Sequence, residues 1–316
     1  MELIFWIIVF IVSLALLVKG ADWFVESSEK IGLAFKISPF IIGVTIVALG
    51  TSFPELITSI FAVLKGASEI VVANALGSNI TNILLIVGFS AMVARKLIVK
   101  RSLIDLDAPL LAASTVLFIF IMWDKTVNFW EGILLISAFL VYLLYTIFQK
   151  REEDHLVLEE MVETVQTKLD FKVFFFLILG GVLLAVGANY VVESVLKISE
   201  FLKISASLIA ITAVAVGTSL PELVVSVRAA AKKKYEIALG NIFGSNVFNI
   251  LIVVGVPALF KSLTVDELTF NIGLPFLIAA TLLFIISGIS RRIHIWEGIM
   301  YILIYVLFIV KLCGLF

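Results

Sequence analysis

Long apolar runs, separated by short charged or turn-forming stretches, recur from one end of the chain to the other. About 20 apolar residues are enough to cross a bilayer as a helix, because each helical residue adds about 1.5 Å. Ten such runs can be delimited, and we expect each to be a membrane-spanning helix. They cover residues 3–19, 40–65, 70–93, 103–122, 128–149, 173–189, 207–231, 236–260, 268–288 and 297–315.

The composition agrees with this pattern. Of the 316 residues, 62% are hydrophobic and 15% are charged, whereas a soluble domain is about half apolar and about a quarter charged. We therefore predict an all-α polytopic membrane protein whose surroundings are the lipid bilayer. Nothing in the sequence indicates a nucleic-acid partner or an obligatory protein partner. The single cysteine, Cys313, excludes an intrachain disulfide and a cysteine-based metal site.

Lysine and arginine are unevenly divided between the two sets of loops. Ten spans place both termini on the same side, and cytoplasmic loops are enriched in Lys and Arg. With both termini outside, 17 of the 23 basic residues lie in inner loops, among them Lys232–Lys234, and 6 lie in outer loops. This bias predicts a multi-pass plasma-membrane protein with both termini extracellular.

The sequence contains an internal repeat. "TIVALGTSFPELITS" at 45–59 returns as "TAVAVGTSLPELVVS" at 212–226, and "NALGSNITNILLIVG" at 74–88 returns as "NIFGSNVFNILIVVG" at 241–255. Each copy contains five spans, and five is odd, so the second copy enters the membrane from the opposite side. Inverted repeats are typical of secondary transporters, whose substrate site lies near the midplane. A channel or an intramembrane enzyme could also be duplicated.

The duplication divides the chain into three parts. Residues 1–149 form the first five-helix repeat, with its motif region at 43–88. Residues 173–316 form the second, inverted repeat, with its motif region at 210–255. Between them, residues 150–172 form an acidic cytoplasmic linker, in which apolar residues at helical spacing permit a short amphipathic helix.

Two glutamates lie near the middle of predicted spans, Glu55 in the second and Glu222 in the seventh. A charge at the bilayer centre costs at least ~2.5–3.5 kcal/mol. Its occurrence at equivalent positions of both repeats indicates a function. Each glutamate follows a glycine and a proline that weaken a helix, since proline lacks the N–H that would pair with a carbonyl one turn earlier. We expect helices broken at the midplane by Gly50, Pro54, Gly217 and Pro221.

The residues around the glutamates are oxygen donors. The first repeat contributes Thr51, Ser52, Ser78, Asn82 and the carbonyl of Ala48, and the second contributes Thr218, Ser219, Ser245, Asn249 and the carbonyl of Ala215. Hard cations such as Ca²⁺ take many oxygen ligands, and Na⁺ has a similar radius, whereas zinc and copper prefer nitrogen and sulfur. The histidines, His155 and His294, fall in inner loops. We therefore expect Ca²⁺ and Na⁺ as transported ions and no cofactor.

The charge of this site favours exchange. With both glutamates ionised, the site alone carries a charge of −2 in a low-dielectric region, which hinders its passage between access states. One Ca²⁺, or two or more monovalent ions, relieves that penalty and ties the return movement to the counter-ion. Exchange of three Na⁺ for one Ca²⁺ would be electrogenic.

With G-T-S-x-P-E-L and G-S-N-x-x-N each present twice, the chain resembles the cation/calcium exchanger superfamily, specifically its prokaryotic sodium/calcium exchanger-like branch. The resemblance implies a ten-helix fold with four cation sites at mid-membrane, in which the first and sixth helices slide across the remaining bundle. It implies Glu55 and Glu222 as carboxylate ligands, with further ligands at Thr51, Ser52, Ser78, Asn82, Thr218, Ser219 and Ser245 and carbonyls from Ala48 and Ala215. Where some members have aspartate, this chain has Asn249, which leaves the ion stoichiometry and potassium dependence open.

Sodium/calcium antiport is the first hypothesis. Exchange of Ca²⁺ against H⁺, or with participation of K⁺, would use the same residues. A cation channel would need a continuous pore, which suits a duplicated site in broken helices less well. An intramembrane hydrolase using Ser52 or Ser219 lacks a neighbouring His or Lys base, so we do not predict an enzyme.

Overall fold

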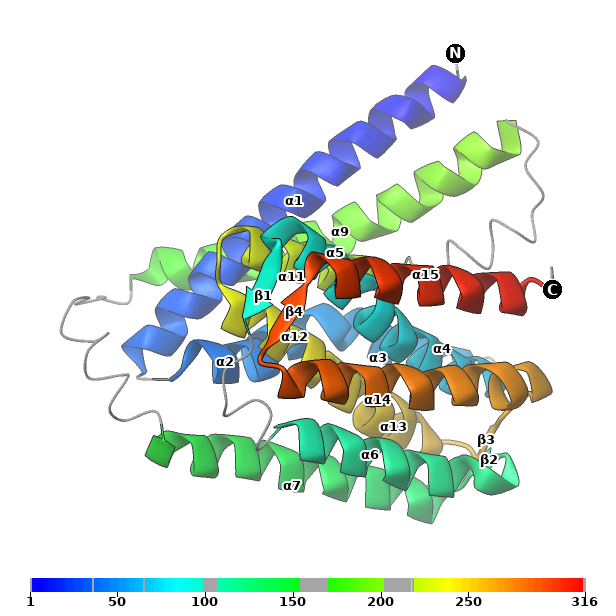
Figure 1. Ribbon diagram of the computed structural model, residues 1–316. Coiled ribbons are helices and arrows are strands. Elements are labelled where there is room, and N and C mark those ends of the chain that lie inside the picture. Colours follow the sequence, from blue (N-terminus) through cyan, green and yellow to red (C-terminus); the bar gives the residue numbers. More distant parts are fainter. Residues whose placement is uncertain are drawn as a thin grey trace.

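The structure, a computed structural model, describes residues 2–35, 37–64, 66–98, 107–153, 170–201, 217 and 219–314. This part of the chain is almost entirely helical (Figure 1), which confirms the all-α class. The elements of the first half are α1 (Glu2–Ala34), α2 (Pro39–Ile42), η1 (Gly43–Val47), α3 (Ala48–Leu64), α4 (Glu69–Ile80), η2 (Thr81–Ile86), α5 (Val87–Ala94), β1 (Lys96–Ile98), α6 (Ala108–Ile121), η4 (Met122–Asp124), β2 (Thr126–Val127) and α7 (Phe129–Glu153). Those of the second half are α9 (Phe171–Phe201), α11 (Leu220–Ala231), α12 (Tyr235–Phe248), η5 (Asn249–Val253), α13 (Val254–Ala258), β3 (Leu263–Thr264), η6 (Thr269–Gly273), α14 (Leu274–Ile289), β4 (Arg292–His294) and α15 (Ile295–Leu312).

Most predicted spans correspond to described helices. Eight helices within the described residues are long and apolar enough to cross a membrane, and a ninth, shorter apolar helix covers Ala108–Asp124. The predicted seventh span, 207–231, is described as α11 from Leu220 onward. The predicted linker, 150–172, lies outside the described residues from 154 to 169, and its neighbours α7 and α9 reach Glu153 and begin at Phe171.

The first and sixth helices are much longer than their apolar runs. The runs at 3–19 and 173–189 predicted short spans, yet α1 has 33 residues and α9 has 31. A helix of 33 residues is about 50 Å long, which exceeds the bilayer's hydrocarbon core of about 30 Å. In both helices the apolar run shows only which part can lie in the hydrocarbon core. The helix continues beyond that run because the charged residues there are also good helix formers.

These two long helices pack against each other outside the remaining bundle (Figure 1). They cross where glycine removes the side chain: a Cβ added to Gly20 would lie 2.9 Å from the carbonyl oxygen of Gly180. Only 17% and 22% of the residues in their apolar windows are buried. The pair therefore meets the rest of the protein along one side and leaves the other side for lipid.

The centre of the bundle is α12 with its continuation through η5 and α13. In this span, 94% of the residues in the apolar window are buried. The junction of α2 and η1 packs on α12 at very close range, since a Cβ on Gly240 would lie 2.6 Å from the carbonyl oxygen of Phe40 and 3.0 Å from Cα of Gly43. Helices in a membrane associate through such close backbone approach at small residues.

The inverted repeat appears in the packing as paired contacts. Gly88 of α5 packs on Gly298 of α15, and the equivalent residues, Gly255 of α13 and Gly132 of α7, pack on each other in the same way. A Cβ would meet a backbone carbonyl within 3.1 Å at each of the four positions. The two halves are thus two copies of one arrangement, which confirms the predicted repeats.

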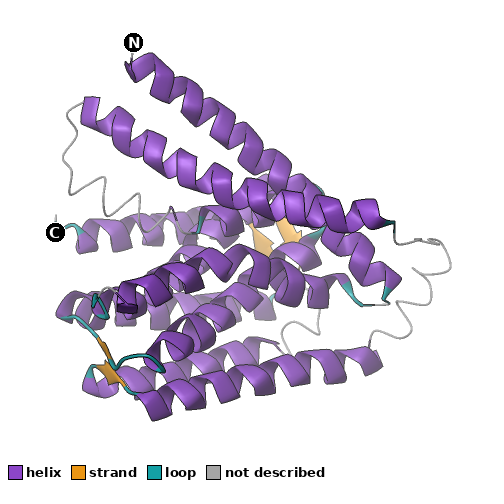
Figure 2. Ribbon diagram, turned by 180° about the vertical axis from the view of Figure 1, so that it is seen from behind, coloured by secondary structure: helices purple, strands orange, loops and turns teal. Residues whose placement is uncertain are grey.

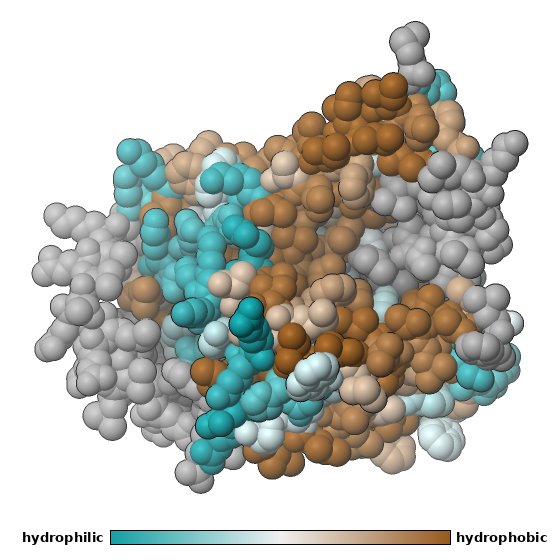
Figure 3. Space-filling model, turned by 45° about the horizontal axis from the view of Figure 1, so that its top comes forward, coloured by the Kyte–Doolittle hydropathy of each residue, from teal (hydrophilic) through white to brown (hydrophobic). Residues whose placement is uncertain are grey.

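Two short antiparallel ribbons lie at opposite ends of the bundle. Strand β1 pairs with β4, and β2 pairs with β3, so each ribbon joins one strand from each half. The N- and C-termini lie together at the end that carries the β2–β3 ribbon (Figures 1 and 2). A belt of hydrophobic side chains covers the surface between the ends, and hydrophilic side chains gather mainly on the side of the β1–β4 ribbon (Figure 3).

Candidate cation site

The two predicted carboxylates are buried within the bundle. Glu55 on α3 is 0% exposed and Glu222 on α11 is 1% exposed. The Ser52 hydroxyl, one turn before Glu55, donates a hydrogen bond of 2.8 Å to Oε1 of Glu222. This bond joins the repeated motif of the first half to that of the second, so the structure brings the two half-sites together.

The second pair of motif helices adds more buried oxygen atoms. Ser78 and Asn82 come from α4 and η2, and their equivalents Ser245 and Asn249 come from α12 and η5. All four are at most 2% exposed. Helix α12 packs on α3 and α11, and α4 packs on α3, which places these side chains on the helices that surround the glutamates.

Many of these polar atoms have no hydrogen-bond partner among the described residues. They are both carboxylate oxygens of Glu55, Oε2 of Glu222, the hydroxyls of Ser78, Ser219 and Ser245, and both side-chain polar atoms of Asn82 and Asn249. Buried polar groups are normally hydrogen-bonded, and leaving one unpaired costs about 1–3 kcal/mol. So many unpaired oxygens around two carboxylates form a donor set suited to hard cations.

Two hydroxyls of the predicted set are held by neighbours and still have lone pairs to offer. Thr51 lies 3.1 Å from Oδ1 of Asn241 on α12, to which it donates, and Asn241 in turn donates to Ser226 at 2.9 Å. Ser52 donates to Glu222 in the same manner. A hydroxyl has one proton and two lone pairs, so a hydroxyl that donates its proton can present its oxygen to a cation.

Sequence reasoning missed the asparagines that orient this site. Asn241 fixes Thr51, and Asn79 on α4 donates a 3.0 Å hydrogen bond to the backbone carbonyl of Asn246 on α12. Asn79 and Asn246 are both the asparagine of the repeated Gly-Ser-Asn motif. Their repetition was the available signal, but only the structure shows that this residue joins the two halves.

The predicted break at Gly50 and Pro54 requires correction. Helix α3 continues through both residues, and the irregular backbone lies just before it, in the π-helical turn η1. Pi-helical turns also occur at η2 and η5, which contain Asn82 and Asn249. A local π-helical turn can compensate for the hydrogen bond that proline removes inside a membrane helix. Helix α3 therefore changes its hydrogen-bond pattern locally, at η1, and does not end at Pro54.

The motif glycines serve packing against the two long helices. A Cβ on Gly50 would lie 2.4 Å from the ring of Phe24 on α1, and a Cβ on Gly217 would lie 2.7 Å from Val192 on α9. Each glycine therefore leaves room for a side chain of α1 or α9 against the repeated motif. In the second half, α11 begins at Leu220 with Pro221 in its first turn, where the missing N–H is tolerated.

The other residues singled out in the sequence are either outside the described part of the chain or away from the glutamates. Thr218 and Ala215 are outside the described residues, as is His155. His294 lies in the β1–β4 ribbon and Cys313 lies just beyond α15, both away from the glutamates. A third buried carboxylate, Asp107, precedes α6 and is 1% exposed, but it belongs to the first half only and has no repeated counterpart in the motifs.

Fold and site together define a polytopic membrane protein with two buried carboxylates among oxygen donors, contributed by two inverted repeats. The chain matches the family described as sodium/calcium exchanger protein over residues 5–148 and 172–314, and it belongs to that family.

Individual relatives support this membership. The chain is 34% identical over 342 residues to sodium/calcium exchanger MaX1 of Methanosarcina acetivorans, with 96% of this chain and 97% of that protein covered. A solved structure of the sodium-calcium exchanger NCX_Mj, soaked without Na⁺ and Ca²⁺, superposes with a TM-score of 0.80 at 33% identity, covering 98% of this chain and 99% of that one. A shorter match, 33% identical over 130 residues, joins 41% of this chain to 20% of human sodium/potassium/calcium exchanger 3.

Proposed function

We propose that this protein exchanges Na⁺ for Ca²⁺ across the membrane by alternating access. The observation that carries the proposal is the pair of buried glutamates, one from each inverted repeat, surrounded by unpaired oxygen donors. Membership in the sodium/calcium exchanger family supports the choice of ions.

The proposed ligands are the two carboxylates and the neutral oxygens on the surrounding helices. Glu55 and Glu222 supply the charge, and the neutral donors are Thr51, Ser52, Ser78, Asn82, Ser219, Ser245 and Asn249, together with Thr218 and the carbonyls of Ala48 and Ala215. No histidine or cysteine is within this set. The absence of a third carboxylate at Asn249 gives each half the same donor types.

The charge of the site explains the coupling. Two ionised glutamates in a low-dielectric region repel each other and resist movement of the site without an ion. One Ca²⁺ neutralises them, and several Na⁺ do the same from the other side. The protein therefore returns only when loaded with one ion or the other. If three Na⁺ replace one Ca²⁺, each cycle moves one net charge.

The basic residues indicate the orientation. Arginine and lysine gather at the end of the bundle that carries the β1–β4 ribbon, where Arg95, Lys96, Arg291 and Arg292 lie. The termini lie at the other end (Figure 1). Because cytoplasmic loops are richer in basic residues, the proposed arrangement places the β1–β4 ribbon in the cytoplasm and both termini outside a plasma membrane.

Ion flux into sealed vesicles tests this function. Calcium uptake into Na⁺-loaded vesicles should greatly exceed uptake into K⁺-loaded vesicles at the same pH, and a membrane potential should change the rate. Equal uptake under both conditions would exclude sodium coupling. The short match to a sodium/potassium/calcium exchanger makes K⁺ co-transport the second candidate; a requirement for K⁺ on the calcium side would establish it, and uptake driven by a pH gradient alone would establish proton exchange.

A further inference from the structure

The β1–β4 ribbon presents four cations that form no salt bridge with any residue the structure describes. They are Arg95, Lys96, Arg291 and Arg292. Nearby basic residues behave differently: Arg228 and Lys232 at the end of α11 pair with Asp22 on α1, at 2.7 and 2.9 Å. The ribbon therefore holds positive charge that the described protein does not balance.

The register of the ribbon places two of these charges, Lys96 and Arg292, on its outer face, and Arg95 and Arg291 directly precede the strands. Leu97 and Ile293 are opposite each other and fully buried, whereas Arg292 and His294 on the other face are exposed. Lys96 pairs directly with His294 and shares that outer face. Period-two alternation along a strand separates an anchored apolar face from a charged outer face.

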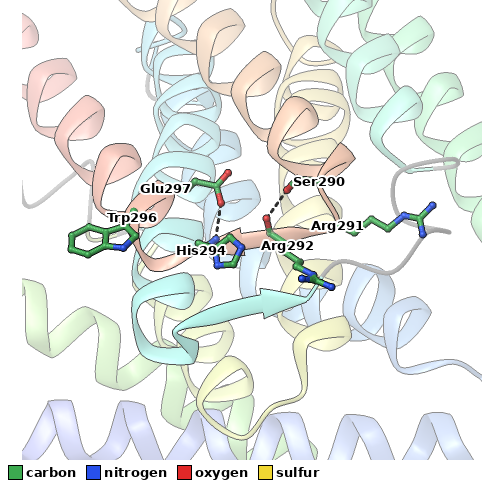
Figure 4. A pocket seen from close by; sticks show the side chains of 6 residues that line it. All are labelled: Ser290, Arg291, Arg292, His294, Trp296 and Glu297. Carbon is green, nitrogen blue, oxygen red and sulfur yellow. Dashed lines mark hydrogen bonds between the residues drawn. The ribbon is translucent and has the colours of Figure 1, made fainter.

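A surface pocket of about 580 Å³ opens beside the strand. It is lined by Ser290, Arg291, Arg292, His294, Trp296 and Glu297, with Trp296 at one edge and Arg291 at the other (Figure 4). The carboxylate of Glu297 caps α15, since its Oε2 accepts a hydrogen bond of 2.7 Å from the backbone N–H of His294. Trp296 is 75% exposed.

The other half of the repeat provides an internal comparison. Asn128, Trp130 and Glu131 occupy the positions equivalent to His294, Trp296 and Glu297, and Glu131 caps α7 by accepting the N–H of Asn128 at 2.8 Å. There Lys125, at the position equivalent to Arg291, is bound by Glu267 at 2.6 Å. The positions equivalent to Arg291 and Arg292 are thus a paired lysine, Lys125, and an uncharged Thr126, so the fold does not require two unpaired arginines there.

We propose that this pocket binds the phosphate-bearing headgroup of an anionic phospholipid. Arg291 and Arg292 would contact the phosphate, since guanidinium groups match its geometry. Trp296 would lie at the level of the headgroups, where its amphipathic ring is stable. A lipid is favoured over a soluble anion because the pocket lies where α14 and α15 leave the bilayer, and their apolar surfaces continue from it. Basic pockets at this end of membrane helices bind such headgroups.

The purified protein in a non-ionic detergent can be titrated with dioctanoyl phosphatidylglycerol or dioctanoyl phosphatidylcholine, with bound lipids counted by native mass spectrometry. We expect the wild type to prefer phosphatidylglycerol. Each basic residue contributes about fivefold near an anionic surface, so the double variant Arg291→Gln/Arg292→Gln should weaken phosphatidylglycerol binding by about 25-fold. The variant Arg291→Lys/Arg292→Lys should retain most of it.

The matched control is Lys261→Gln/Lys311→Gln, which removes two exposed charges at the opposite end and should leave the preference unchanged. An equal loss in this control, or no preference in the wild type, would overturn the proposal. Displacement of the lipid by millimolar glycerol 3-phosphate would also overturn it, because the occupant would then be a soluble phosphate. The wild-type titration does not depend on whether the variants fold, and none of these measurements depends on which ions the central site carries.

Discussion

Glu55 and Glu222 occupy equivalent positions in two nearly identical motifs, yet their carboxylates have different neighbours. Glu222 accepts a hydrogen bond from Ser52. Neither oxygen of Glu55 has a partner among the described residues, and the hydroxyl of Ser219, the equivalent of Ser52, is also unpaired. The two copies of the repeated motif therefore have different hydrogen-bond arrangements in the same molecule. A transporter built from inverted repeats changes access by moving one repeat against the other, and a difference between its halves is what a single access state requires.

The ends of the molecule differ more strongly than its centre. Arg228 and Lys232 bind Asp22 and Glu26, which ties the end of α11 to α1. The residues equivalent to Arg228 and Asp22 are Phe61 and Asn189, so the same ion pair cannot join α3 to α9. The buried polar residues of the motifs are thus repeated in both halves, whereas this ion pair occurs in one half only.

The largest effect is expected at the two glutamates. Glu55→Gln and Glu222→Gln should each reduce calcium flux in sealed vesicles at least about 100-fold. Each change removes a buried negative charge that would balance the bound cation, and removing one partner of a buried charge pair costs about 3–5 kcal/mol. Both variants should still fold. Glu267→Gln, which changes an exposed carboxylate, is the control. Near-normal flux in both site variants would refute the ligand assignment.

Gly77 and Gly244 are equivalent in sequence but not in packing. A Cβ on Gly244 would lie 2.5 Å from the carbonyl oxygen of Val44, whereas a Cβ on Gly77 meets nothing within 4 Å. Gly244→Ala should lower the free energy of unfolding by about 1–3 kcal/mol through overpacking, and Gly77→Ala should not. Thermal unfolding in detergent measures both, and equal melting temperatures would contradict the packing difference.

The hydroxyls of Ser52 and Ser219 allow a finer comparison. Ser52→Ala removes the bond to Glu222 and leaves a buried carboxylate oxygen unpaired, which costs about 1–3 kcal/mol. Ser219→Ala removes a hydroxyl without a described partner and should change thermal stability less. If both serines are cation ligands, both variants raise the calcium concentration needed for half-maximal flux. A larger loss of stability in Ser219→Ala would show that the two halves have been assigned the wrong way round.

The ion pairs of α1 should contribute less. Asp22→Asn removes the shared partner of Arg228 and Lys232, which are partly exposed, so we expect a loss of about 0.5–1 kcal/mol that decreases with salt. Asn189→Ala at the equivalent position of α9 is the control. Thermal unfolding at low and high salt measures the difference, and a salt-independent loss would argue against an electrostatic cause.

The smallest effect concerns Glu267, which pairs with Lys125 beside the β2–β3 ribbon. The hydrogen bond and positive charge of Lys125 lower the pKa of the exposed Glu267 below its ordinary value of 4.5. A lowered pKa means that the ion pair is fully formed above pH 4.5 and is lost as the pH falls through the lowered value. Carboxyl ¹³C resonances in nanodiscs should show this midpoint, and Lys125→Gln should move it up towards 4.5. An unchanged midpoint would mean that the pair does not form in the membrane.

Several features were accessible from the sequence because they depend on residue type and spacing. Apolar runs located the spans, and the motif copies, 167 residues apart, showed the inverted repeat. The mid-span position of Glu55 and Glu222 predicted two carboxylates inside the bundle, where both are buried; the cation site that they would form stays a prediction. Expectations failed where a local signal was given too much weight: Pro54 is a helix breaker in water, but inside a packed membrane bundle α3 accommodates it.

What the sequence by itself determined is the part of this protein that hydrophobicity, charge and duplication specify: a polytopic helical bundle with two buried carboxylates among oxygen donors. The tertiary structure alone decided which of those oxygens are held and by what. The Thr51–Asn241 and Asn79–Asn246 bonds join residues 190 and 167 positions apart, and Gly50 accommodates Phe24 from another helix. Such contacts depend on how helices pack, and packing is set by the shapes of all the side chains at once rather than by any segment's own pattern.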